Sequence, residues 1–600
     1  MKLSRVYEEK ERKTKMKRLK KMIAFIVAAV MILGTMNMAF ADPTEGGTTP
    51  DTSSTIGDLT SDAQITILGL DVGDVVHLYQ VLKWTDGEGW TIADGFEALV
   101  TEGDSNYCQK VQDLIDNKPG TTLAKEDIEK IANVAKASSP TDLGGSVAEG
   151  EDSFIYSTTA DPGMYIALVT PGAAGVVYNP IIVSADFSAT PQTSEIDAST
   201  AVMGSSAVAK KEIITVTKEV EDAETAQASD NTHNVGDIVK FTITGLVPAY
   251  SDSYVNPTYK ITDTLTEGLE LVIDESHEFK VESADDLVHV DTQSDDYVEP
   301  VNEGTGFTLP FISSEIAALV DYNTVTITYY AKITSEAETN VTEEENTVTV
   351  EFSNNPQEDG DAGIIKDKTK HYTFTIDGNM LGKTSWKNSE IVKVGVEADG
   401  ETPIESTTEL SNGTEIAALQ GATFGLYKNR DDAENATAGN PGNLYTNELF
   451  DGTVVSGADG RMTINGLDAG TYYLKELDAP NGYIRDTTIY EITIEANIEP
   501  ETVRETIEGR VVTYDVPVLK DYTITVTPPG NASKFTTTIS GSQVLESVSG
   551  TDITTSAKNV KGVELPATGG IGTTIFYVIG SVLVLGAGIL LVTRRRMNGN

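Results

Sequence analysis

The sequence is poor in the residues that most often build covalent or metal-bound sites. Cys108 is the single cysteine in 600 residues, so an internal disulfide is excluded. The histidines are few and widely spaced, and they predict neither a metal site nor a histidine-based catalytic triad; they lie at positions 77, 233, 277, 289 and 371. We therefore expect no metal and no other cofactor.

Positive charge is also scarce. The chain has 43 Lys and Arg against 92 Asp and Glu. A surface this acidic repels nucleic acid, which we exclude as a partner.

The N-terminus has the pattern of a secretory signal peptide, which we place at residues 1–41. Residues 2–21 are rich in Lys and Arg, and residues 22–36 are almost wholly apolar. Small residues at 39 and 41 predict cleavage between Ala41 and Asp42. The rest of the chain is therefore expected to be secreted.

The C-terminus predicts a membrane segment. Residues 571–593 carry no charge and are long enough to cross about 30 Å of hydrocarbon. The basic tail that follows, residues 594–600, contains three arginines and is expected to stay in the cytoplasm.

Between these ends the hydrophobic period is two. Val325, Ile327 and Tyr329 alternate with polar residues, as in half-buried antiparallel strands. Helical patterning is scarce, and its best cases are residues 105–117 and 122–138. We predict a mainly β protein of tandem β-sandwich modules with some helix in the first; the modules cover residues 56–205, 206–362 and 363–562.

Three polar residues fall in phase with apolar strand faces in the middle module: Lys218, Asp263 and Asn354. One interpretation is an ordinary buried ion pair beside an amide, or strands that end one residue early. The other is chemical. Burial favours a neutral amine and a protonated acid, and a neutral amine facing an asparagine can form an isopeptide bond with loss of ammonia. Such a bond would replace the missing disulfides.

Several longer motifs resemble one protein family. "KITDTLTEGLEL" (260–271) and "NTVTVEFSNNP" (346–356) are similar to the middle domain of backbone (major) pilins of sortase-assembled pili in Gram-positive bacteria. "LQGATFGLYK" (419–428) and "GTYYLKELDAPNGY" (470–483) resemble a Cna-B type domain. The resemblance covers essentially the whole chain and implies immunoglobulin-like (Cna-type) sandwiches, with a Lys218–Asn354 isopeptide bond assisted by Asp263.

The resemblance also implies an isopeptide bond in the third module. Its glutamate is Glu476, and the matching lysine and asparagine are Lys393 and Asn559. Lys383 is an alternative lysine, because an apparent insertion disturbs the match.

Polymerisation in this family joins a sorting motif to a lysine near the junction of the first two domains. The lysine that corresponds is Lys210, with Lys211 as the alternative, although the usual Tyr-Pro of that motif is absent. The sorting motif "LPATG" lies directly before the apolar segment and consists of Leu565, Pro566, Ala567, Thr568 and Gly569.

The expected function is that of a shaft subunit of a covalent, cell-wall-anchored pilus. The chain would be a sortase substrate rather than an enzyme. Its expected partners are sortase, further copies of itself, minor pilins and peptidoglycan. A monomeric wall-anchored adhesin is the alternative, since it would share the anchor and the internal bonds.

Overall fold

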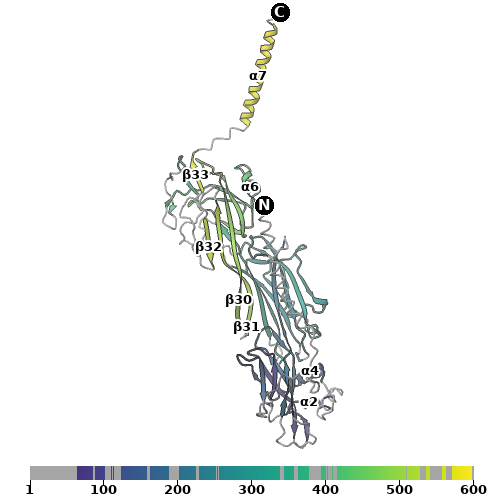
Figure 1. The fold of residues 1–600 in the computed structure, drawn as a ribbon. Helices are drawn as coiled ribbons and strands as arrows, with labels where there is room; N and C mark the ends of the chain where they lie inside the picture. Colours follow the sequence, from purple (N-terminus) through teal and green to yellow (C-terminus); the bar gives the residue numbers. More distant parts are fainter. Residues whose placement is uncertain are drawn as a thin grey trace, which may run out of the picture. The chain divides into compact units, whose positions relative to one another are not determined.

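The computed structural model describes residues 64–562 and 571–597 with internal gaps, the longest being most of 102–122 and residues 188–201, 377–392 and 541–556. The described chain is mainly β, as the alternating pattern predicts (Figure 1). It divides into two compact units. Unit 1 contains residues 1–169 and 179–210, and unit 2 contains residues 170–178 and 211–600. The predicted signal peptide and its cleavage site, Lys383 and the sorting motif lie outside the described residues.

Unit 1 combines two sheets with a helix. The helix predicted at 122–138 is α4 (Lys125–Ser138), and α2 (Ala98–Thr101) is a single turn. The apolar residues of α4 pack on the larger sheet around Ile131, Phe96 and Ile166. The strand orders are β10 (Ser206–Val208), β1 (Gln64–Leu68), β5 (Ser153–Ser157) in the smaller sheet, and β3 (Gly89–Ile92), β2 (Val75–Thr85), β6 (Gly163–Thr170), β8 (Ile181–Phe187), β9 (Val202–Gly204) in the larger, with β4 (Gly145–Ser146) on β2.

Unit 2 contains two apolar cores. The first, which we call the middle core, lies between two antiparallel sheets. One sheet has the order β12 (Val216–Asp222), β13 (Ile238–Val247), β18 (Asn323–Ile333), β15 (Leu269–Val272), with β16 (Lys280–Ser283) on β18; the other has the order β17 (Gly306–Pro310), β14 (Tyr259–Leu265), β19 (Glu344–Ser353), β20 (Ala362–His371). Shorter elements accompany them: β7 (Val176–Tyr178) with β11 (Lys211–Ile213), the 3-10 turn η1 (Ala284–Asp286) and α5 (Ser313–Ala317).

The second, C-terminal core is built on a six-stranded sheet. Its order is β26 (Thr453–Val455), β25 (Thr423–Tyr427), β28 (Gly470–Asp478), β30 (Ile489–Ile507), β31 (Arg510–Thr527), β32 (Phe535–Ser540). A smaller sheet has the order β22 (Lys393–Val396), β33 (Ala557–Lys561), β29 (Tyr483–Ile484). The remaining elements are β21 (Phe374–Ile376) with β27 (Ile464–Leu467), β23 (Thr408–Glu409) with β24 (Glu415–Ile416), α6 (Arg430–Asn435) and the C-terminal helix α7 (Ile571–Met597).

The strand alternation explains why polar residues can enter the middle core. In β18 every second residue is buried and the residues between them are half-buried, so one face of the strand meets the opposite sheet. Lys218 in β12 and Asp263 in β14 obey the same alternation and point into the core. Burial at these positions is set by strand phase rather than by the polarity of the residue.

The longest strands, β30 and β31, form a ribbon that connects the two cores of unit 2 (Figure 1). β31 packs along β20, the edge strand of the middle sheet. Lys366 of β20 pairs with Glu505 of the ribbon at 3.1 Å, and the Leu519 amide donates to the Tyr372 hydroxyl at 3.1 Å. The ribbon is therefore held against β20 by an ion pair and against Tyr372 by a hydrogen bond.

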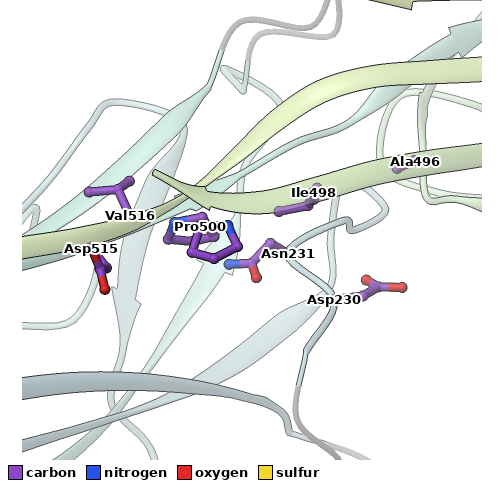
Figure 2. Close-up of a pocket in the computed structure, with 8 residues that line it drawn as sticks. Asp230, Asn231, Ala496, Ile498, Pro500, Asp515 and Val516 are labelled. Carbon is purple, nitrogen blue, oxygen red and sulfur yellow. The ribbon is translucent and has the colours of Figure 1, made fainter. Parts of the chain in front are cut away.

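A cavity of about 390 Å³ lies beside this ribbon, at Asp230 and Asn231. Figure 2 shows Pro500 and Val516 of the ribbon on one side and the 230–231 segment facing them. No lysine lines this cavity, and its wall is part apolar and part acidic.

Candidate functional sites: two buried lysine, acid and asparagine clusters

Lys218 lies in the first of two buried polar clusters. Its Nζ contacts the Asp263 carboxylate, donates to the Tyr329 hydroxyl at 2.7 Å and donates to Asn346 Oδ1 at 2.6 Å. We call Lys218, Asp263, Tyr329 and Asn346 the middle cluster. The side chains of Lys218 and Asp263 are both fully buried.

The two sheets of the middle core each supply half of this cluster. Lys218 comes from β12 and Tyr329 from β18, in one sheet, whereas Asp263 and Asn346 come from the paired strands β14 and β19 of the other. The lysine amine reaches across the core between aromatic rings. Its Nζ is 5.2 Å from the Phe241 ring centroid and 5.3 Å from that of Tyr329.

Burial shifts the pKa of both charged partners toward their neutral forms. Desolvation lowers the pKa of Lys218, against the attraction of Asp263. Desolvation likewise raises the pKa of Asp263, against the attraction of Lys218. An uncharged amine retains its lone pair and can act as a nucleophile, and a protonated carboxyl can act as an acid.

The sequence prediction of Asn354 as the lysine's partner is wrong, because the asparagine at the amine is Asn346. The two residues have the same parity in the sequence, but β19 ends at Ser353, just before Asn354. Asp263 pairs with Val348, next to Asn346 on the inward face of β19. Eight residues of extended chain separate the two asparagines, which is roughly 26 Å at 3.3 Å per residue. Asn354 instead accepts a hydrogen bond from Arg510 Nη1 of the ribbon at 2.8 Å.

The second cluster, which we call the C-terminal cluster, contains Lys393, Glu476 and Asn559. Glu476 Oε2 lies 3.2 Å from Lys393 Nζ and accepts a hydrogen bond from Asn559 Nδ2 at 2.9 Å. A single carboxylate oxygen thus contacts both the amine and the amide. All three residues have no solvent-exposed surface.

Strand pairing brings the C-terminal cluster together. β22 and β33 are parallel neighbours in which Gly395 lies opposite Asn559, so Lys393 is two residues from that pair. Glu476 projects from β28 and is held by the Asp486 amide, which donates to Oε2 at 2.7 Å. The Lys393 Nζ lies 5.1 Å from the Phe424 ring centroid, an aromatic contact of the kind that surrounds Lys218.

The pKa shifts in this cluster have the same direction and cause as in the first. Burial lowers the pKa of Lys393, opposed by Glu476. Burial raises the pKa of Glu476, opposed chiefly by Lys393. The C-terminal cluster therefore also favours a neutral amine beside a protonated acid.

Comparison with known proteins relates the chain to surface proteins of Gram-positive bacteria. A prealbumin-like fold domain family matches residues 411–506, and the LPXTG cell wall anchor motif matches residues 557–599. The trypsin-resistant surface T6 protein of Streptococcus pyogenes serotype M6 is 28% identical over 573 residues, covering 89% of this chain and 95% of the T6 protein.

Solved structures of pilins are also similar. The T6 backbone pilin of serotype M6 S. pyogenes, described as a modular three-domain structure, is 19% identical with a TM-score of 0.48, covering 83% of this chain and 98% of that one. The major pilin SpaD of Corynebacterium diphtheriae is 17% identical with a TM-score of 0.38, covering 77% and 98%.

The chain is thus similar over most of its length to a streptococcal surface protein, and it carries the LPXTG cell wall anchor motif. Its anchor motif ends in α7, which includes an 18-residue apolar segment, Val578–Arg595, long enough to cross a membrane. The protein is therefore a cell-wall-anchored surface protein whose precursor is held in the membrane.

The two lysines considered for polymerisation differ in their surroundings. Lys210, the last residue of unit 1, is exposed, and its carbonyl oxygen accepts a hydrogen bond from the Asn179 amide at 3.1 Å. Lys211 begins β11 in unit 2 and is half-buried, with Nζ 5.9 Å from the Tyr178 ring centroid. Of these two lysines, Lys210 is the more exposed.

Tyr329 and Asn346 are the site residues that sequence reasoning missed. Asn346 is the first residue of the motif "NTVTVEFSNNP" and is in phase with Val348. The alternation therefore already indicated that its side chain points into the core. Tyr329 has the pattern of an ordinary core residue of β18, and only its hydroxyl contacts distinguish it.

Proposed function

We propose that this chain is the shaft subunit of a covalently polymerised pilus, stabilised by two internal Lys–Asn isopeptide bonds. The observation that carries the proposal is the pair of buried clusters. In the middle cluster the lysine contacts both the acid and the asparagine, and in the C-terminal cluster the acid contacts both the lysine and the asparagine. Relationship to the T6 protein over most of the chain and the LPXTG anchor support it. The proposed bonds join Lys218 to Asn346 and Lys393 to Asn559.

Each bond forms by attack of the neutral lysine amine on the asparagine side-chain carbonyl carbon. The buried acid stabilises the tetrahedral intermediate and transfers protons, and the amide nitrogen leaves as ammonia. Aromatic walls and burial exclude water and hold the groups in contact, which supplies the proximity that the reaction needs. The reaction occurs once per molecule.

These bonds would provide the stabilisation that disulfides provide in other secreted proteins. The bond from Lys218 would close a loop of 128 residues, for which the loop-entropy relation gives about 5 kcal/mol. An amide bond cannot be reduced, so the gain also appears as slow unfolding and resistance to proteolysis.

Polymerisation would use the sorting motif and Lys210. A sortase cysteine attacks the Thr568 carbonyl carbon, and the chain from Gly569 onward leaves. The amine of Lys210 in the next copy then displaces the enzyme and forms an intermolecular amide bond. The exposure of Lys210 supports it over Lys211.

The chain thus acts as a substrate and not as a turnover enzyme. Its partners are sortase, further copies of itself in a head-to-tail polymer, minor pilins, and the peptidoglycan amine that ends the polymer. The acidic composition, 92 acids against 43 bases, provides no surface suited to nucleic acid.

Denaturing gels of cell-wall extracts test this function. The wild-type chain, expressed with its sortase, should give a ladder of high-molecular-weight species that resists boiling in detergent. Lys210→Ala should abolish the ladder and leave wall-attached monomer, whereas the matched variant Lys211→Ala should keep it. A wild-type chain found only as wall-attached monomer would instead indicate an adhesin.

A further inference from the structure

The Tyr329 hydroxyl contacts every other member of the middle cluster. It donates to Asp263 Oδ1 at 2.8 Å, accepts from Lys218 Nζ at 2.7 Å and accepts from Asn346 Nδ2 at 2.9 Å. It is thus hydrogen-bonded to both the attacking and the departing nitrogen of the proposed reaction.

The two oxygens of Asp263 contact different partners. Oδ2 lies at the lysine amine, while Oδ1 contacts the Tyr329 hydroxyl. The tyrosine therefore completes a path from the carboxyl to the asparagine nitrogen, Nδ2.

We propose that Tyr329 is a catalytic residue of the middle cluster, relaying a proton from Asp263 to the departing nitrogen of Asn346. This inference rests on the proposed isopeptide function. The hydroxyl would act as an acid toward Nδ2 and would regain its proton from Asp263.

The reaction starts with Lys218 neutral and with Asp263 protonated on Oδ1. Lys218 Nζ attacks Asn346 Cγ, the new C–N bond forms, and one Nζ proton passes to Asp263 Oδ2. Once Nδ2 carries a lone pair in the tetrahedral intermediate, the Tyr329 hydroxyl turns from Oδ1 to Nδ2 and accepts the Oδ1–H bond in exchange. The Oδ1 proton then moves to the Tyr329 oxygen while the hydroxyl proton moves to Nδ2. The Cγ–Nδ2 bond then breaks and ammonia leaves. Asp263 and Tyr329 end neutral, and the new amide keeps one hydrogen.

The tyrosine ring is fixed by its neighbours, which keeps the hydroxyl in position. It stacks on Phe241 with centroids 5.2 Å apart and meets the Phe307 ring edge-on at 5.3 Å. Tyr329 is 1% exposed, so bulk water does not compete for the relay. A preorganised donor of this kind does not need to reorient its surroundings during the reaction.

The C-terminal cluster has a different geometry that makes the relay unnecessary. There Glu476 Oε2 contacts both Lys393 Nζ and Asn559 Nδ2, so one oxygen can accept the proton of the amine and return a proton to the leaving nitrogen. The C-terminal bond therefore serves as an internal control in the same molecule.

The test is the Tyr329→Phe variant, which keeps the stacked ring and removes only the hydroxyl. The full chain is made by cell-free translation, synthesis is stopped, and loss of ammonia, about 17 Da per bond, is followed by mass spectrometry of the intact chain and of its cross-linked peptides. We expect the Lys218–Asn346 bond to form about 10²-fold more slowly, with the Lys393–Asn559 bond unchanged.

Tyr259→Phe is the matched control. Tyr259 is also a buried tyrosine of the middle core, but its hydroxyl has no hydrogen-bond partner among the described residues. Both bonds should form at the wild-type rate in this variant. A structural role for the Tyr329 hydroxyl would lower thermal stability without slowing the middle bond selectively.

The outcomes separate the relay from the proposed function. If the wild-type chain loses no ammonia, the isopeptide function itself fails. If the wild-type chain forms both bonds and Tyr329→Phe forms the middle bond at the same rate, the relay is overturned. Equal slowing of both bonds would also contradict it, since the hydrogen bonds of the Tyr329 hydroxyl all go to the middle cluster.

Discussion

The middle and C-terminal clusters contain the same three kinds of residue in different arrangements. In the middle cluster the acid uses one oxygen for the lysine and the other for a tyrosine that contacts the amide. In the C-terminal cluster one glutamate oxygen contacts both nitrogens directly. Both proposed bonds thus require a buried amine, acid and amide, while the route of the proton depends on how the strands place the acid.

The largest predicted effect distinguishes the two asparagines of the middle module. Asn346→Ala removes the electrophile beside Lys218, so the middle bond should be absent while the C-terminal bond still forms. The free energy of unfolding should fall by about 5 kcal/mol from loop closure alone. Denaturant unfolding and intact mass measure the two effects.

Asn354→Ala is the matched control for that variant. It removes the hydrogen bond from Arg510 of the ribbon, which costs on the order of 1 kcal/mol, and should leave both isopeptide bonds in place. Loss of the middle bond in Asn354→Ala, with its retention in Asn346→Ala, would restore the assignment made from the sequence.

A smaller effect is predicted at Gly460, whose backbone holds Lys393 in the C-terminal cluster. The Lys393 amide donates to the Gly460 carbonyl oxygen at 2.8 Å. Gly460 has φ +75°, and a Cβ there would lie 2.5 Å from the Lys393 carbonyl oxygen. Gly460→Ala should therefore displace Lys393 and slow the C-terminal bond only, as followed by the appearance of its cross-linked peptide.

Gly421→Ala controls for the backbone strain of that substitution. Gly421 also has a positive φ, +90°, but a Cβ there meets nothing within 4 Å. Both variants carry the cost of a left-handed alanine, about 1–2 kcal/mol. If both slowed the C-terminal bond equally, the contact with Lys393 would be irrelevant.

The smallest predicted effect is a pH dependence of the free energy of unfolding that comes from Asp367, beside the middle cluster. Asp367 accepts a hydrogen bond from the Lys218 amide at 2.6 Å, and burial raises its pKa from 3.8 to about 6. The folded state therefore holds this proton more tightly than the unfolded state. Its stabilising contribution is complete below pH 3.8 and is lost as the pH rises through about 6.

Asp367→Asn should remove this part of the pH profile. Denaturant midpoints are measured for the wild-type chain and the variant between pH 3.5 and 7. As the pH falls, the wild-type midpoint should rise relative to that of the variant, because the folded wild-type chain binds the Asp367 proton in that range. If the two midpoints instead keep a constant difference across this pH range, the pKa of Asp367 is the same in the folded and unfolded states.

Much of the fold could be predicted from the sequence because strand phase is a local signal. Alternation identified the β18 strand, and the inward phases of Lys218 and Asp263 followed from the same period. The helix α4 was also predicted, from its apolar spacing. The three-module division stays a prediction; the described chain separates into two units, with two cores in the second.

The choice of Asn354 instead of Asn346 shows what alternation along a single strand cannot determine. Asn346 and Asn354 have the same parity in the sequence, so alternation cannot distinguish them, and the end of β19 at Ser353 is not visible in that pattern. The choice depends on the register of β14 against β19, which places Val348 opposite Asp263. In the C-terminal cluster the resemblance implied three residues that the structure brings together, Lys393, Glu476 and Asn559.

The central claim is that both clusters form isopeptide bonds with the stated partners. Mass spectrometry of the folded full chain tests it most directly, because each bond removes one ammonia, about 17 Da. The predicted result is a loss of about 34 Da, with cross-linked peptides joining Lys218 to Asn346 and Lys393 to Asn559. An unmodified mass, or a cross-link from Lys218 to Asn354, would contradict the account.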